Sequence, residues 1–229
     1  MMMNTELIEK ALSLLNGAKL EDLRNLLMYE RQKSILESSG KKMKLALIVK
    51  RILKKNETVR PVLSTVMYDK QNRPCICDGF LLVRWNEEQP ELKAFPETRD
   101  ERGLAADNII PKKKECEARE LTEADRLVIK NIDKYIKLYA DEKANGQIPV
   151  ELFGKTFDAY LVRDFVGVIG TDFDEIYTQP NRWGKFENTP SVVFNADYDA
   201  VILPLQIQKE EAKQASEERT TRFIEQLKV

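Results

Sequence analysis

The sequence contains no histidine among its 229 residues, which narrows the chemistry open to the protein. Without histidine there is no Ser-His-Asp triad and no Cys-His pair, and the commonest metal ligand is missing. The sequence also lacks a glycine-rich phosphate-binding loop and a His-Glu zinc motif. We therefore expect a protein that is not an enzyme and that needs no cofactor.

Cysteines and long apolar runs are also scarce. The chain has three cysteines, an odd number that favours reduced thiols in the cytoplasm. Cys75, Cys77 and Cys116 could surround a metal ion, but a fourth ligand is lacking, so packed thiols are favoured. No apolar run approaches the ~20 residues of a membrane span, and the start, MMMNTELIEK, lacks the features of a secretory signal. We expect a cytoplasmic protein without membrane contact.

Charge is nearly balanced, with 37 basic and 38 acidic residues, so any affinity for nucleic acid must come from uneven placement. Residues 44–55 show such placement. Apolar residues at helical spacing predict one buried face, and cations fill the other, where only Leu47 interrupts them. The apolar residues are Leu45, Ala46, Ile48, Val49, Ile52 and Leu53, and the cations are Lys44, Lys50, Arg51, Lys54 and Lys55.

No acidic residue lies between Gly40 and Asn56, although solvated helices usually mix both signs. The pattern therefore indicates an anionic partner such as DNA, and an ordinary solvated face remains the alternative. A second basic stripe is predicted on a helix at about 121–143, which Thr122 and Asp125 cap. This stripe contains Arg126, Lys130, Lys134 and Lys137, and it is diluted by Asp133, Asp141 and Glu142. Lys130 and Lys134 join the candidate DNA-binding residues.

Strand patterns follow the first basic helix. The segments 60–69, 73–77, 80–85 and 91–95 predict an antiparallel meander, with turns at 69–72 and at Asp78-Gly79, before a polar loop at 96–114. The segment 146–158 predicts a strand, 159–169 a helix that ends at Gly170, and 174–179, 191–195 and 200–207 three more strands. The chain thus repeats a helix followed by strands, which indicates a duplicated βαβββ unit, with 34–36 as the first strand of the first copy.

The sequence from about residue 41 to 207 resembles bacterial DNA polymerase III beta subunits, the sliding clamps. Arg60, Pro61 and Leu63 match an Arg-Pro-x-Leu segment of that family, and Asp78, Gly79 and Leu82 match its Thr-Asp-Gly-His-Arg-Leu turn. Tyr160-Leu161 and Pro204 match a helix and the last strand of a clamp domain. Three positions of the turn depart from the family, namely Cys77, Phe80 and Leu81.

The resemblance implies an α+β DNA-clamp (processivity) fold, a duplicated βαβββ unit with antiparallel sheets and with helices on one face. In clamps the helices line a hole and offer Lys and Arg to the DNA backbone without reading sequence. A closed ring needs six such domains, so the resemblance implies self-association or a replication partner. The expected organisation is a helical hairpin at 1–40, the clamp-like domain at 41–207 with a helical insertion at about 121–143, and a C-terminal helix at 208–229.

Two functions follow from these observations. The first is a non-enzymatic clamp-like protein that contacts double-stranded DNA during replication or maintenance. The second is a clamp-fold adaptor that does not bind DNA and engages a partner through its terminal helices. An enzyme that uses Asp172 and Asp174 is a third interpretation, but the sequence GTDFDE around them is typical of a solvated turn.

Overall fold

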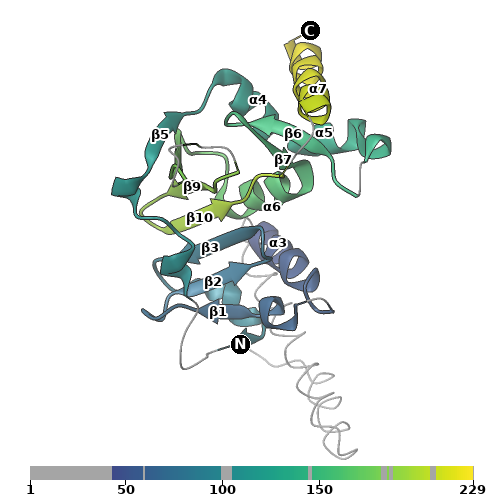
Figure 1. The fold of residues 1–229 in the computed structure, drawn as a ribbon. Helices are drawn as coiled ribbons and strands as arrows, with labels where there is room; N and C mark the ends of the chain where they lie inside the picture. The colour runs from purple at the N-terminus through teal and green to yellow at the C-terminus, as the bar shows by residue number, and fades with distance from the viewer. Residues whose placement is uncertain are drawn as a thin grey trace, which may run out of the picture.

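A large sheet with helices against one face organises the chain in the computed structural model (Figure 1). The structure describes residues 43–58, 60–98, 105–143, 146–181, 185, 188–206 and 210–228. Within these ranges the sheet has eight strands in the order β4-β1-β2-β3-β10-β9-β8-β5, and β6 and β7 form a separate hairpin. The predicted α+β class is confirmed. The predicted N-terminal helical hairpin and the strand at 34–36 lie outside the described residues.

The first half of the sheet follows α3 and is a three-stranded meander. Its elements are α3 (Met43–Lys54), β1 (Val66–Tyr68), β2 (Pro74–Cys77) and β3 (Leu81–Trp85). The predicted Asp78-Gly79 turn joins β2 to β3. The Asp78 carboxylate accepts hydrogen bonds from the backbone N–H groups of Phe80 and Leu81, and Gly79 adopts a φ of 93°. Glycine reaches positive φ without a steric penalty, so this residue type fits the turn.

The second half repeats the order of a helix followed by three antiparallel strands. Its elements are α6 (Ala159–Ile169), β8 (Glu175–Thr178), β9 (Ser191–Phe194) and β10 (Tyr198–Ile202). Asp158 caps α6 by accepting from the N–H of Tyr160, and Gly170 ends the helix as expected. The predicted single strand before α6 is a hairpin of β6 (Pro149–Leu152) and β7 (Lys155–Asp158), because Phe153 and Gly154 both turn with positive φ.

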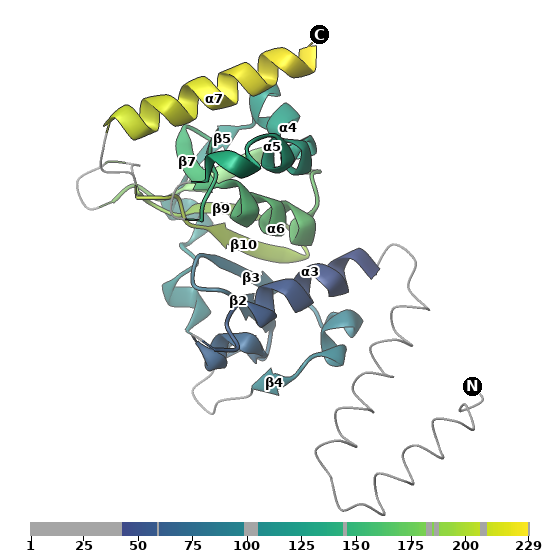
Figure 2. The ribbon, with the colours of Figure 1, turned by 90° about the vertical axis from the view of Figure 1, so that its right-hand side faces the viewer.

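The two halves meet where β3 pairs antiparallel with β10 over five residue pairs, from Leu81↔Ile202 to Trp85↔Tyr198. The strand order is therefore mirrored across this seam, β1-β2-β3 on one side and β10-β9-β8 on the other. Helices α3 and α6 pack against each other over the same face of the sheet (Figure 2). Their inward side chains, among them Val49, Ile52 and Phe165, belong to one core with Ile76 and Ile202.

Short 3₁₀ helices replace part of two predicted strands. The predicted strand 60–69 begins with η2 (Pro61–Ser64) and is a strand only at β1, and 91–95 overlaps η3 (Pro90–Ala94). Each begins with a proline, whose missing N–H group costs nothing at the first position of a helix. Strand β4 (Glu97–Thr98) follows η3 and pairs parallel with β1, so the sheet is mixed and not purely antiparallel as predicted.

The predicted helix at 121–143 is broken into three pieces. These are α4 (Glu123–Lys130), α5 (Ile132–Leu138) and η6 (Ala140–Glu142). The capping box between Thr122 and Asp125 is present at the start of α4. At the junction, Asn131 leaves helical geometry with φ −116° and ψ 21°, while its side-chain amide donates to the carbonyl of Leu127.

The expected C-terminal helix is α7 (Glu210–Lys228). It packs against β6 and α4, and it buries Phe223 in the main core. The Thr220 hydroxyl accepts a hydrogen bond from the N–H of Glu151, and it lies 3.4 Å from the Tyr135 hydroxyl. The apolar side of α7 is therefore buried against the rest of the protein.

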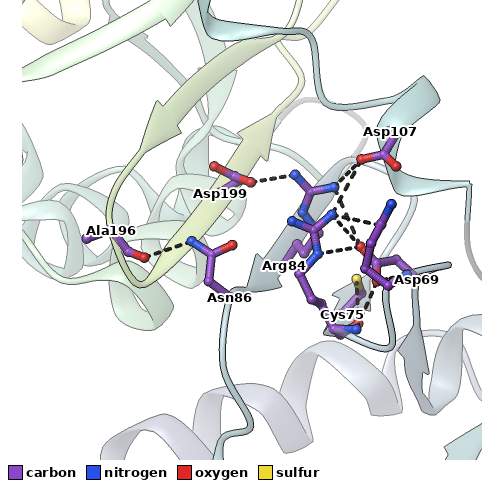
Figure 3. A network of polar contacts seen from close by, with 9 residues as sticks. Asp69, Cys75, Arg84, Asn86, Asp107, Ala196 and Asp199 are labelled. Carbon is purple, nitrogen blue, oxygen red and sulfur yellow. Dashed lines mark hydrogen bonds and ion pairs between the residues drawn. The ribbon is translucent and has the colours of Figure 1, made fainter.

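The opposite face of the sheet is covered by the segment after β4, where a polar loop was predicted. This segment contains η4 (Ala106–Asn108), η5 (Lys113–Glu115) and β5 (Glu117–Glu120), which pairs antiparallel with β8. Ala106 and Ile110 pack on Cys75, and Arg84 on β3 reaches two carboxylates (Figure 3). Its guanidinium nitrogens lie 2.5 Å from Asp107 and 2.5 Å from Asp199, which ties the segment to the sheet.

Candidate nucleic-acid interface

Helix α3 has the two faces that its sequence predicts. Ala46, Ile48, Val49, Ile52 and Leu53 are buried against the sheet and α6. The opposite side carries the cations, and Leu47 lies among them with 53% of its surface exposed. The hydrophobic effect fixes the apolar side against the core, and this leaves the basic side of the helix turned outward.

The predicted cations of α3 divide into two groups. Lys50 and Lys54 are exposed, and neither has a carboxylate partner among the described residues. Arg51 and Lys55 instead form ion pairs with Asp164 on α6, at 2.5 Å and 2.6 Å. Part of the basic face is therefore paired inside the protein, whereas the sequence pattern indicated that its cations would meet an anionic partner. The side chain of the remaining candidate, Lys44, lies outside the described residues.

Asp164 is the residue that organises this region. Its side chain is completely buried, and it accepts contacts from Arg51, Lys55 and, at 3.4 Å, Arg163. A buried carboxylate needs such partners because its desolvation is costly. One sequence signal for this residue was missed. On α6, Asp164 lies between the buried residues Leu161 and Phe165, so a charge occupies the face that packs inward.

Positive charge remains in excess around Asp164. Three cations contact this single carboxylate, and Lys50 and Lys54 add two more charges on the adjoining surface. Asp78 contributes a second acid, 3.8 Å from Lys55, and Asp158, which lines the adjoining cavity with Lys55, a third. On α6, the guanidinium of Arg163 lies 5.2 Å from the centre of the Tyr160 ring. The α3–α6 face thus keeps a net positive charge after its internal pairs are counted.

Lys130 and Lys134 lie on α4 and α5, and both are exposed. Helix α6 lies between α5 and α3 on the helical face, so these lysines are not brought into contact with the cations of α3 (Figure 2). Arg126 of the same predicted stripe pairs with Asp174 at 2.8 Å. The exposed Asp133 neighbours Lys134 and dilutes its charge, as the sequence indicated.

A cavity of about 800 Å³ adjoins the basic face. It lies between the end of α3, the Asp78-Gly79 turn and the segment after β10. Phe80 is 54% exposed at its rim, and Leu203, Pro204 and Leu205 give it an apolar wall. Lys55 and Arg60 also line it, so the cavity is continuous with the cationic surface.

The described residues do not form a metal centre. They hold no group of three or more cysteine or carboxylate side chains that could bind a metal ion. Cys75 is buried and free, and Cys77 and Cys116 are also free thiols. Asp174, which a carboxylate enzyme would require, is 86% exposed and paired with Arg126. None of the helices in the described ranges combines the length and hydropathy of a membrane crossing.

Comparison with protein-family models, with curated proteins and with solved structures finds no match for this chain.

Proposed function

We propose that the face formed by α3 and α6 binds the phosphate backbone of double-stranded DNA without reading its sequence. The observation that carries this proposal is the charge excess on that face. Lys50 and Lys54 are exposed without a carboxylate partner among the described residues, and Arg51, Lys55 and Arg163 share one buried carboxylate. Cations on a rigid helix suit phosphate contact, and such contacts carry no sequence information.

The mirrored arrangement of the sheet supports a clamp-like fold as part of this proposal. Each half is a helix followed by three antiparallel strands, and both helices lie on one face. This is the arrangement that the resemblance to sliding clamps implies for one domain. Strand β7 precedes α6, but it pairs with β6 and not with the main sheet, which departs from the expected unit. The proposed role is non-catalytic and needs no cofactor.

Lys130 and Lys134 have a secondary role in the proposal. They lie beyond α6, so they would contact phosphates only on duplex DNA that crosses the whole helical face. To surround DNA, the chain would have to associate with further copies or with a replication protein, because its described residues form a single mirrored pair of units. Light scattering of the purified protein measures this directly, since a ring requires a mass that is a multiple of 26.5 kDa.

The test of DNA binding is the salt dependence of duplex affinity. Fluorescence anisotropy with two unrelated duplexes should give similar dissociation constants and a steep negative slope of log affinity against log salt. In the K50Q/K54Q variant the slope should become shallower by about 2, because each lost phosphate contact contributes about 0.9. K112Q/K114Q removes the same charge from the segment on the opposite face and should leave the slope unchanged.

Absence of duplex binding at low salt would overturn this function and leave the second candidate, an adaptor for a protein partner. One observation favours that candidate, namely the apolar wall of the cavity beside Phe80, Leu203 and Leu205. The adaptor would use this cavity more readily than α7, because Phe223 of α7 is already buried. A folded F80A variant that loses a protein partner which the wild type retains would support this role.

A further inference from the structure

The hairpin of β6 and β7 leaves a cavity of about 490 Å³ where its tip meets the edge strand β5. This cavity is separate from the α3–α6 face. Its walls come from β5, the turn at Gly154 and the end of β8. The lining residues are Glu117, Ala118, Arg119, Phe153, Gly154, Lys155, Thr178 and Lys185.

Lys155 supplies the buried charge of this cavity. Only 9% of the residue is exposed, and its ammonium group donates to neutral oxygens alone. The acceptors are the Thr189 carbonyl at 2.9 Å, the Thr178 hydroxyl at 3.2 Å, and the Thr189 and Ser191 hydroxyls at 3.3 Å. No carboxylate of the described residues lies within ion-pair distance of it. A lysine is rarely buried to this extent without an anionic partner.

The surroundings of Lys155 add positive charge. Burial and, as the smaller cause, the nearby guanidinium of Arg119 together lower the pKa of Lys155 to about 8. The carboxylate of Asp125 lies 3.8 Å from the guanidinium of Arg119, and the Arg119 side chain is 45% exposed. Lys185 also lines the cavity, and Glu117 is the only acid among the lining residues that the structure describes.

Gly154 leaves room for the guanidinium of Arg119 beside the hairpin. A Cβ atom at this glycine would lie 2.6 Å from Nη1 of Arg119, and the φ of Gly154 is 69°. The glycine therefore allows both the tight turn and the close approach of the guanidinium to the hairpin. Phe153, next to it, contributes an aromatic wall.

We propose that this cavity binds a small oxyanion, a phosphate monoester or a carboxylate, between Lys155 and Arg119. The anion supplies the counter-charge that no described residue gives the buried ammonium, and the forked guanidinium of Arg119 offers two parallel donors to it. Lys185 lies at the same cavity as a further cation. The volume suits a small organic ligand, whose apolar part would rest on Phe153.

Lys155 also ties the hairpin to the main sheet through its hydroxyl and carbonyl acceptors. That structural role alone predicts no saturable anion binding. The first test therefore measures the binding of sulfate by calorimetry at pH 7. Sulfate is a dianion that does not itself titrate near neutral pH. We expect saturable binding at one site. K155M should weaken it by about tenfold or more, and R119Q by severalfold, because each removes a charged donor.

K70Q removes an exposed lysine from the turn between β1 and β2, in the other half of the sheet, and should change sulfate affinity by less than twofold. If K155M does not fold, R119Q decides the question, because Arg119 is partly exposed. The charged groups facing Lys155 are Arg119, Lys185 and Glu117, with Asp125 behind Arg119. Because Lys155 loses its proton near pH 8, sulfate affinity should fall by about tenfold between pH 7 and pH 9.

Phosphate, glycerol phosphate and acetate as second probes distinguish a phosphate site from a carboxylate site. Duplex DNA affinity should be the same for K155M and the wild type, so failure of this site is separable from failure of the DNA face. The proposal is overturned if sulfate, phosphate and acetate all fail to saturate. Equal sulfate affinity of R119Q, folded K155M and the wild type would also overturn it.

Discussion

A guanidinium nitrogen of Arg51 on α3 lies 2.5 Å from a carboxylate oxygen of Asp164 on α6. The arginine side chain is 40% exposed, whereas the aspartate side chain is completely buried. The pair therefore joins the two helices beneath the surface while leaving the cation partly in water. As a result, the same aspartate stabilises the fold and reduces the positive charge of the helical face.

Replacement of Asp164 by Asn should separate these two effects. Arg51 and Lys55 lose their carboxylate, and the free energy of unfolding should fall by about 1–3 kcal/mol, because the partners are partly solvated. The face gains one positive charge, so duplex affinity at low salt should rise by about two- to fivefold. Urea unfolding and anisotropy measure the two quantities.

The matched control for this variant is D133N, which removes an exposed acid from α5. It should change the free energy of unfolding by less than about 0.5 kcal/mol. An Asp164→Asn protein as stable as the wild type would contradict the structural role of the buried carboxylate.

The contact between α3 and α6 depends on Gly167, where an added Cβ would lie 2.6 Å from Cδ1 of Ile48. G167A should therefore lower the free energy of unfolding by about 1–2 kcal/mol, because overpacking outweighs the better helix propensity of alanine. I48V removes the clashing atom. In that background G167A should cost much less or stabilise the protein, which a double-mutant cycle in urea detects. If the effects of G167A and I48V on the free energy of unfolding were additive, α3 and α6 would have to move apart without cost when the Cβ atom is added.

Lys155 should give stability a distinctive pH dependence. Its pKa is near 8 in the folded protein and returns to an ordinary value, about 10.4, on unfolding. Between these values the unfolded state binds more protons, so stability rises with pH. Relative to K155M, the wild type should gain up to about 1.4 kcal/mol per pH unit from pH 8 to 10. Urea titrations of both proteins at several pH values measure the difference, and parallel pH profiles would contradict it.

The buried thiol of Cys75 should be nearly inert. Burial, assisted by the negative charge of Asp69, raises its pKa to about 12 from an ordinary value of 9.0. At pH 8 its thiolate fraction is then about 1000-fold below that of a free cysteine. Cys116 is partly exposed, so iodoacetamide followed by mass spectrometry should label Cys116 first and Cys75 only in urea. Rapid labelling of Cys75 in the native protein would show that the segment over it opens.

Helices α3 and α6 and the hairpin of β2 and β3 could be predicted from the sequence because their signals are local. Apolar spacing in α3 matches one face of a helix, and Asp78-Gly79 has the conformational freedom that the turn uses. The register of the hairpin follows from that turn. In each case the deciding interactions lie within a few residues of one another.

The features that were missed depend on distant partners or on weak patterns. Strand β5, with the sequence Glu-Ala-Arg-Glu, has four exposed residues and no alternation, and only its pairing with β8 makes it a strand. The ion pairs of Asp164 with Arg51 and Lys55 join residues more than 100 positions apart. The burial of Lys155 in β7 has no local signal, because its acceptors come from a loop and strands later in the chain.

The seam between β3 and β10 has a consequence for synthesis on the ribosome. Strand β3 ends at Trp85, but its partner β10 begins at Tyr198. The β3 edge of the first half of the sheet therefore stays unpaired while the residues between the two strands are translated. An unpaired edge of buried, apolar residues is prone to wrong pairing with other nascent chains. The cell's chaperones should therefore matter most for this protein during that interval, and truncations that end before Ile202 should aggregate.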